Sequence, residues 1–207
     1  MTLFVKLCGI RSQADLEAAV EAAADAVGLV ITPSPRQITL SQAGSLMSQL
    51  PDHVLGVAVF HDPSPELLRR VEDEVAPDLF QAELPSLAWM PADRILPVVV
   101  DGEALETDLD RALDATTRGM VLVDSAAKGG TGRASDWDRL AGLDTINSVV
   151  LAGGLNGRNV AEAVAKVRPF GVDVSSGIER RPGEKDPDLM RAFVMAARSA
   201  ELKGELL

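Results

Sequence analysis

Short apolar runs recur along the chain, and most are separated by segments with the ~3.6-residue period of an amphipathic helix. Eight runs have the length of a buried strand: 4–8, 26–31, 54–60, 79–82, 95–100, 120–123, 149–152 and 172–174. Helical periodicity is found in the segments 12–24, 41–50, 65–75, 103–115, 159–167 and 187–200. Strands that alternate with helices in this way predict an α/β fold, a (β/α)8 TIM barrel that forms a single domain over residues 1–207.

Two of the expected helices are short, because segments 87–92 and 137–140 hold only a turn or two at ~3.6 residues per turn. A barrel with shortened helices 4 and 6 suits a chain of 207 residues, near the lower limit of about 200 for this fold. A doubly wound sheet is the competing architecture, but it usually has fewer strands and longer crossovers. Ser41 and Ser64 are expected as helix N-caps, and Pro65 follows the second where its missing N–H does no harm.

The composition indicates which residues fill the core, and the net charge limits the kinds of partner. Hydrophobic residues make up 46% of the chain but aromatic residues only 3%, with no Tyr, so the core is expected to be aliphatic, as in parallel barrels. A net charge of -11 argues against a nucleic-acid partner or an anionic membrane surface, although a few focused cations can still bind a small anionic molecule.

A single cysteine excludes an internal disulfide, and no apolar run near the N-terminus has the length of a signal peptide. These observations indicate a cytoplasmic protein that does not enter a membrane. The sequence carries no readable pattern for its oligomeric state.

In a barrel of this kind, the carboxyl ends of the strands carry the functional residues. The polar and small residues at those positions are Cys8, Arg36, Gln81, Asp124, Gly153, Gly154, Ser175, Ser176 and Gly177. The two glycines lie in the loop after the seventh strand, and the Ser-Ser-Gly segment follows the eighth. Glycine lets backbone N–H groups approach an anion closely, and these two loops commonly bind phosphate in barrels. Either loop alone would be read as an ordinary turn, but together they predict a phosphate site.

Cys8 ends the first apolar run and is followed by Gly9, and a helix start with the spacing Ser12 to Asp15 comes next. A lone thiol is more often a small buried hydrophobe than a catalyst, but its place at a strand end favours a functional role. As a base it must lose a proton with a reference pKa of about 8.5, which a nearby cation would assist.

Lys6 points to the same face as Cys8, into the barrel. We expect it to form a buried pair with Asp173 of the adjacent eighth strand, and Asp173 is counted among the residues that meet the substrate. Gln81, within the fourth strand, is counted there as well.

Asp124 ends the sixth apolar run and would place a carboxylate over the barrel mouth, where it is either a helix cap or a general acid whose pKa is raised by burial. The glycine-rich loop 128–133 that follows could close over the cavity, with Gly130 contacting the substrate. Arg36 lies in a loop stiffened by Pro33 and Pro35 and suits the recognition of a planar carboxylate.

Other chemistries find no support in the residues. His53 and His61 are the only histidines, and no Cys/His spacing suggests zinc, so no metal is expected. No Gly-rich dinucleotide motif follows a strand, and no Walker loop is present, so no cofactor is expected.

Six blocks of sequence span nearly the whole chain. They are KLCGI at 6–10, DAVG at 25–28, SPRQI at 34–38, VLVD at 121–124 with GGTG at 129–132 and DW at 136–137, LAGGLN at 151–156 with NV at 159–160, and VDVSSG at 172–177 with PG at 182–183 and KD at 185–186. In their order and spacing, these blocks together resemble phosphoribosylanthranilate isomerase.

The resemblance implies a cofactor-free barrel that converts N-(5-phosphoribosyl)anthranilate to 1-(2-carboxyphenylamino)-1-deoxyribulose 5-phosphate by an Amadori rearrangement in tryptophan biosynthesis. It implies that Asp124 is the general acid at the ribose ring oxygen and Cys8 the base at C2. It also implies that Arg36 holds the anthranilate carboxylate, while the loops 153–154 and 175–177 hold the phosphate.

The chain departs from this family at three places. Glu83 and Leu84 stand where the family commonly has His-Gly, the fifth strand lacks a basic residue, and Ser135 replaces an aromatic residue. Two alternatives therefore accompany the isomerase. One is a dual-specificity isomerase that also accepts the related histidine-pathway aminoaldose, although such barrels generally carry Asp where this chain has Cys8. The other is a phosphate-binding barrel without catalysis.

Overall fold

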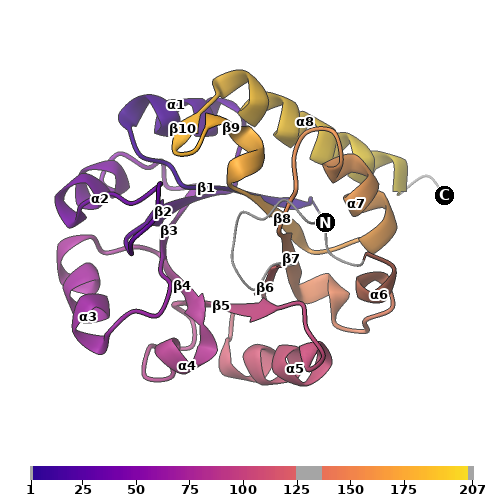
Figure 1. Cartoon of the computed structure of the whole chain (residues 1–207), viewed down its shortest axis with the longest axis horizontal. Helices are drawn as coiled ribbons and strands as arrows, with labels where there is room; N and C mark the ends of the chain where they lie inside the picture. The colour runs from indigo at the N-terminus through magenta and orange to yellow at the C-terminus, as the bar shows by residue number, and fades with distance from the viewer. Residues whose placement is uncertain (1, 125–136, 205–207) are drawn as a thin grey trace.

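The computed structural model describes residues 2–124 and 137–204 and shows a closed barrel of eight parallel strands, each paired with its neighbours in chain order (Figure 1). The strands are β1 (Phe4–Cys8), β2 (Ala26–Val30), β3 (Leu55–Val59), β4 (Leu79–Glu83), β5 (Ile95–Val100), β6 (Val121–Asp124), β7 (Val149–Ala152) and β8 (Gly171–Val174). Each agrees with an expected apolar run to within one residue at either end. The predicted (β/α)8 TIM barrel is confirmed.

Helices surround the barrel in Figure 1. They are α1 (Gln13–Glu21), α2 (Leu40–Met47), α3 (Pro65–Glu74), α4 (Leu84–Leu87), α5 (Leu105–Ala115), α6 (Trp137–Ala141), α7 (Val160–Val167) and α8 (Pro187–Gly204), with short 3-10 turns η1 (Ile146–Ser148) and η2 (Ser176–Ile178). Helices α4 and α6 have 4 and 5 residues, so both are short as expected, but α4 begins three residues before the expected segment 87–92. A hairpin of β9 (Glu179–Arg181) and β10 (Glu184–Lys185) follows β8 and was not expected from the sequence.

The N-caps show why three of the helices begin where they do. Ser12 and Asp15 form a reciprocal capping box at α1, and Ser64 caps α3 ahead of Pro65, as the sequence predicts. The expectation that Ser41 caps α2 is wrong, because Thr39 is the N-cap and its side chain bonds the backbone N–H of Gln42. A threonine two residues earlier already satisfies that donor, so Ser41 lies inside the first helical turn.

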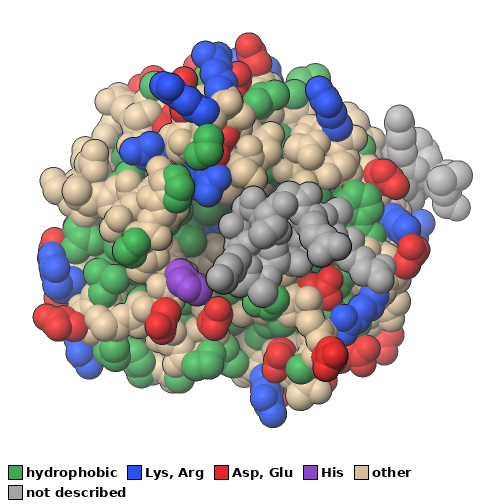
Figure 2. Space-filling view, in the orientation of Figure 1, with side chains coloured by type: hydrophobic (Ala, Val, Ile, Leu, Met, Phe, Trp, Pro, Cys, Tyr) green, Lys and Arg blue, Asp and Glu red, His purple; other side chains and the backbone are tan. Residues whose placement is uncertain are grey.

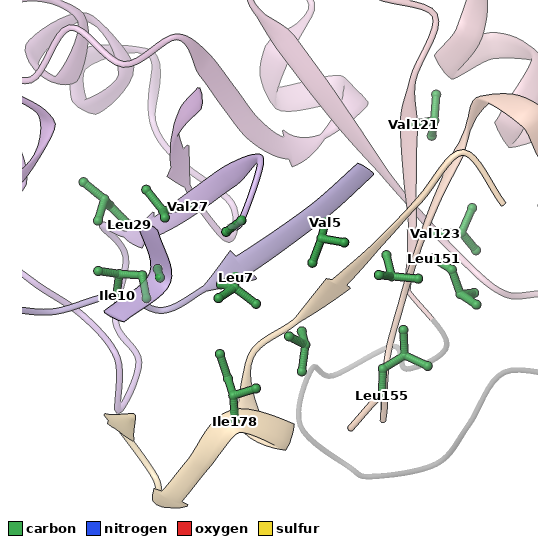
Figure 3. Packing of buried hydrophobic residues seen from close by; sticks show 14 of the residues in the cluster. Val5, Leu7, Ile10, Val27, Leu29, Val121, Val123, Leu151, Leu155 and Ile178 are labelled. Carbon is green, nitrogen blue, oxygen red and sulfur yellow. The ribbon is translucent and has the colours of Figure 1, made fainter. Parts of the chain in front are cut away.

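Successive side chains along each strand point alternately toward the helices and toward the barrel interior, so the buried hydrophobic residues form two clusters. Residues such as Val121 and Val123 of β6 face the helices, and Figure 3 shows them with members of the same cluster from β1, β2 and β7. Leu122, between them, faces the barrel interior, which is filled by a second, aliphatic cluster. The stacked rings of Phe4 and Phe170, whose centroids are 5.7 Å apart, pack against this interior cluster at the amino end of the strands.

The same alternation directs polar side chains into the interior near the carboxyl ends of the strands. Lys6 and Cys8 share the interior face of β1 with Phe4, and Gln81, Asp124 and Asp173 occupy interior positions of their own strands. A cavity lies at this end of the molecule. Within the part of the chain that the structure describes, no helix is long and apolar enough to cross a bilayer.

Candidate active site

A cavity of about 630 Å³ opens at the carboxyl ends of the strands, and side chains from all eight strands or the loops after them line it. Most of the residues singled out in the sequence lie on its wall: Cys8, Arg36, Gln81, Asp124, Gly153, Gly154, Asp173, Ser175 and Ser176. Figure 2 views this end and shows Lys and Arg side chains gathered over the β9–β10 hairpin. The barrel thus brings together in one cavity residues that are up to 168 positions apart, from Cys8 to Ser176.

A buried ion pair lies beside Cys8. Nζ of Lys6 donates to Oδ1 of Asp173 at 2.7 Å, and the Lys6 side chain is fully buried. The pair joins neighbouring strands, because Lys6 and Asp173 are direct register partners on β1 and β8. The expected pairing of these two residues is confirmed. Burial lowers the pKa of Lys6, but Asp173 and the Cys8 thiol outweigh it and leave that pKa above its ordinary value.

Cys8 is buried, with 6% of the residue exposed, and it lines the cavity. Burial raises the pKa of Cys8 above its ordinary value, and the negative charge of Asp173 adds to this effect. The cations Lys6 and Lys185 act in the opposite direction, because each stabilises the thiolate. The site therefore holds a buried thiol whose deprotonated form would be stabilised by the two ammonium groups of Lys6 and Lys185.

Gly28 of β2 makes room for this thiol. A methyl group at Gly28 would lie 2.8 Å from Sγ of Cys8 and 3.1 Å from Nζ of Lys6, both closer than ordinary contacts. Gly28 is also the register partner of Cys8 on the adjacent strand. The absence of a side chain at this one position allows both groups of β1 to occupy the barrel interior.

Arg36 is held by a second ion-pair cluster at the rim. Its Nε and Nη2 donate to the two carboxylate oxygens of Glu179 at 2.7 and 2.9 Å, a bidentate pair. Glu179 also accepts from Nζ of Lys185 at 2.8 Å, and the side chains of both residues are buried. Among the described residues, Nη1 of Arg36 makes no hydrogen bond. The Nη1/Nη2 edge of the guanidinium therefore remains available to a ligand, while the Nε/Nη2 edge is used within the protein.

The loops after β7 and β8 approach each other closely. Gly153 and Gly154 both have positive φ, which L-residues with a side chain seldom adopt, and side-chain amides of Asn156 and Asn159 both bond the carbonyl of Gly154. Gly177 does not line the cavity. A methyl group there would lie 2.0 Å from the carbonyl oxygen of Leu155, so this glycine lets the second loop pack against the first.

Two buried polar atoms on the cavity wall lack a protein partner within the described part of the chain, namely Oε1 of Gln81 and Oγ of Ser175. Unpaired buried acceptors and hydroxyls are costly, and a ligand in the cavity would satisfy them. Asp124 lies at the end of β6 on the same wall. Gly130 and the loop 128–133, which the sequence singles out, lie outside the described residues.

Sequence reasoning missed the roles of Glu179, Lys185 and Gly28. Glu179 and Lys185 belong to a hairpin with the sequence ERRPGEK at 179–185, and a run of charges of this kind usually marks an exposed segment. Gly28 sits inside an apolar strand, where a glycine is itself a sign that another group approaches closely. The sequence could therefore have predicted a close approach at Gly28, but not that the approaching groups are Cys8 and Lys6.

His61 and Glu83 also line the cavity, at the ends of β3 and β4. Glu83 is the residue that replaces the histidine common in the family the sequence resembles. Within residues 2–124 and 137–204, no group of three or more His, Cys, Asp or Glu side chains is placed to hold a metal ion.

The fold and the cavity together define the class of protein. It is an enzyme built on a (β/α)8 barrel, with a thiol, a carboxylate, buried cations and two glycine- and serine-containing loops around a pocket of small-molecule size.

Comparison with known proteins identifies the family. Residues 5–196 match the family model of N-(5'phosphoribosyl)anthranilate (PRA) isomerase. The chain is 40% identical to N-(5'-phosphoribosyl)anthranilate isomerase of Afipia carboxidovorans over 97% of its own length and 91% of that relative. The chain belongs to the phosphoribosylanthranilate isomerase family.

Solved structures agree with this assignment. The phosphoribosyl anthranilate isomerase of Thermotoga maritima superimposes with a TM-score of 0.81 at 38% identity, over 95% of this chain and 99% of that one. A second isomerase structure, a complex with reduced 1-(o-carboxyphenylamino)-1-deoxyribulose 5-phosphate, gives a TM-score of 0.78 at 37% identity, with the same coverage.

Proposed function

We propose that this chain is a phosphoribosylanthranilate isomerase that converts N-(5-phosphoribosyl)anthranilate to 1-(2-carboxyphenylamino)-1-deoxyribulose 5-phosphate in tryptophan biosynthesis. Family membership supports the reaction, and one observation of this chain carries the assignment of roles. Cys8 and Asp124, from β1 and β6, line the same cavity together with Arg36 and the loops after β7 and β8. An acid, a base and sites for two anionic ends of one substrate thus surround one space.

The reaction needs one proton donor and one proton acceptor. In the proposed mechanism, the Asp124 carboxyl protonates the ribose ring oxygen, so that the C1–O bond breaks and a Schiff base forms between C1 and the anthranilate nitrogen. The Cys8 thiolate then removes the proton from C2. The resulting enolamine takes a proton at C1 and loses the proton of its C2 hydroxyl, which gives the 2-ketone. General acid and base groups contribute about 10²–10⁴-fold each in such steps.

The two ends of the substrate differ in shape, and the cavity offers a different partner for each. A planar carboxylate fits the Nη1/Nη2 edge of Arg36, whose Nε/Nη2 edge is fixed by Glu179. The phosphate fits the loop of Gly153 and Gly154 together with the loop of Ser175 and Ser176. Oε1 of Gln81 is placed to accept a hydrogen bond from a ribose hydroxyl between these two ends.

Turnover of phosphoribosylanthranilate, followed by the loss of its fluorescence, tests the function and the two roles. We expect wild-type turnover and a fall in kcat of about 10²–10⁴-fold in Cys8→Ala and in Asp124→Asn. Asp52→Asn, at an exposed position before β3, is the matched control and should keep the wild-type rate. A normal rate in either cavity variant would refute its role, and a wild type without turnover would instead favour a phosphate-binding barrel.

The role of Arg36 has its own test. Arg36→Ala should raise KM and weaken inhibition by an anthranilate analogue that lacks the phosphate, because both depend on the carboxylate. Unchanged inhibition by that analogue would contradict the assignment. Assaying the related histidine-pathway aminoaldose with the same wild-type protein tests the dual-specificity alternative, which turnover of both substrates would support.

We also propose a cytoplasmic location. A biosynthetic enzyme whose base is a free thiol needs a compartment that keeps thiols reduced, and the cytosol provides one.

A further inference from the structure

Lys185 is a buried cation with no part in the acid–base steps described above. Its side chain is fully buried at the end of the β9–β10 hairpin, and its Nζ donates to the carbonyl oxygen of Ser175 at 2.8 Å and to Oε1 of Glu179 at 2.8 Å. Burying an ammonium group is costly unless its partners are well placed, so a lysine in this position requires a reason.

The contacts of Glu179 extend the cluster to the rim of the cavity. The Glu179 side chain is 4% exposed. Its Oε1 accepts from Nζ of Lys185 and from Nε of Arg36, and its Oε2 accepts from Nη2 of Arg36. A carboxylate with a single cation could pivot, whereas one held from two directions has a fixed plane. The plane of Glu179 in turn fixes the plane of the Arg36 guanidinium, because the pair is bidentate.

The cluster also packs against the turn that follows Cys8. A methyl group placed on Gly9 would lie 2.7 Å from Cδ of Arg36 and 3.1 Å from both Nζ of Lys185 and Oγ of Ser175. Gly9 has a positive φ of 81°, and the close approach leaves no room for a side chain. The loops that follow β1, β2 and β8 thus meet around Lys185.

We infer that Lys185 is a positioning residue: its ammonium group fixes Glu179, and through it the guanidinium of Arg36, against the loop after β8 and beside Cys8. The inference rests on the proposed function, since it assigns to Lys185 the alignment of the carboxylate-binding edge with the thiol. Lys185 touches neither the reacting atoms nor the substrate in this role. Lys185 orients Arg36 through Glu179, and its positive charge acts on the Cys8 thiol.

The charge of Lys185 supports the same role. The groups whose charges act on the thiol or are acted on by it are Lys6 on the same strand, Asp173 on β8, Lys185 on β10 and Arg36 after β2. Lys6 is paired with Asp173, whereas Glu179 is shared between two cations, so the rim cluster keeps one net positive charge. Burial, the largest effect, leaves the pKa of Lys185 below its ordinary value, and Arg36 adds to this shift, whereas Glu179 and Cys8 favour the charged form.

The test uses the only cysteine as a reporter. Because the chain has one Cys, the pH dependence of alkylation by iodoacetamide measures the Cys8 thiol without any turnover. In Lys185→Met, which keeps the length of the side chain but not its charge, we expect the alkylation midpoint at a higher pH than in wild type. We also expect kcat/KM to fall about 100-fold, the size expected when reacting groups are misaligned by about 1 Å.

Two further variants separate position from charge. Glu179→Gln leaves the ammonium group beside Cys8 but weakens the hold on Arg36, so KM should rise while the alkylation midpoint does not move upward. Arg181→Met removes an exposed cation from the same hairpin and should change neither measurement. If Lys185→Met does not fold, the double variant Glu179→Gln/Lys185→Met, which removes both buried charges, takes its place.

A folded variant without Lys185 that keeps the wild-type alkylation midpoint and a kcat/KM within twofold of wild type would overturn the inference. So would a midpoint shift of equal size in Arg181→Met, because the charge would then act without position. The two proposals fail separately: if wild type has no turnover, the proposed function fails, and the alkylation midpoints still decide whether Lys185 acts on Cys8.

Discussion

Replacing Gly28 by alanine would test how closely the barrel interior confines the thiol of Cys8. The change adds one methyl group to an otherwise unaltered strand. That methyl would lie 2.8 Å from Sγ of Cys8, 3.1 Å from Nζ of Lys6 and 3.2 Å from Cα of Cys8, whereas ordinary contacts begin at 3.4 Å. Because the third neighbour is backbone, a change of rotamer alone cannot relieve all three contacts.

Two magnitudes follow from this geometry. Overpacking a well-filled interior by one methyl group costs about 1–3 kcal/mol, so the free energy of unfolding should fall by that amount. The thiol must also move away from its present place on the cavity wall. Since a misplacement of about 1 Å costs roughly 100-fold in rate, we expect kcat/KM to fall by about that factor, far more than the loss of stability explains.

The assay compares three measurements on Gly28→Ala and wild type: turnover of phosphoribosylanthranilate, the rate of Cys8 alkylation, and urea denaturation. Gly142→Ala is the control, because a methyl group there would meet only one atom, at 3.5 Å. The control should match wild type in turnover and alkylation. A Gly28→Ala protein with kcat/KM and alkylation within twofold of wild type would refute the argument that this glycine exists to seat the thiol.

Three further predictions follow. Burial raises the pKa of Cys8, so kcat/KM should increase with pH through a limb above the ordinary pKa of a thiol, and a limb at or below that ordinary value would contradict the raised pKa. Lys6→Met leaves Asp173 buried without its cation and should lower the unfolding free energy by about 3–5 kcal/mol in urea titrations; a change below 1 kcal/mol would argue against the pair. Thr39→Ala should cost about 1 kcal/mol and Ser41→Ala much less, and equal losses would contradict the observed cap.

Much of the barrel was predictable because its signal is local. A buried parallel strand is a short continuous apolar run, and helix periodicity between such runs is visible without any knowledge of the fold. The places of Cys8 and Asp124 on the cavity wall follow from the same logic, since a residue that ends a barrel strand faces the mouth. Even the pairing of Lys6 with Asp173 follows, because strands 1 and 8 of a closed barrel are neighbours.

The rim cluster was not predictable, because its partners are far apart in sequence. Arg36 and Glu179 are 143 positions apart, and nothing near Arg36 reveals that one edge of its guanidinium is already occupied. Segment 179–185 lacks apolar alternation, so the hairpin it forms is fixed by contacts of Glu179 and Lys185 rather than by strand propensity. Ser41 was misassigned because Thr39, equally able to cap, lies two residues earlier.

The ion pair between the first and last strands has a consequence for how the protein is made. The groups that neutralise or align Lys6 and Arg36 are Asp173, Glu179 and Lys185, which a ribosome adds only after it has made β1 to β7. An incomplete chain carries these two cations without their carboxylates, so its amino-terminal portion lacks the partners that make their burial tolerable. Two fragments produced separately, one ending before β8 and one beginning there, would form the cavity only when they associate, and recovered turnover would report that closure of the strand ring.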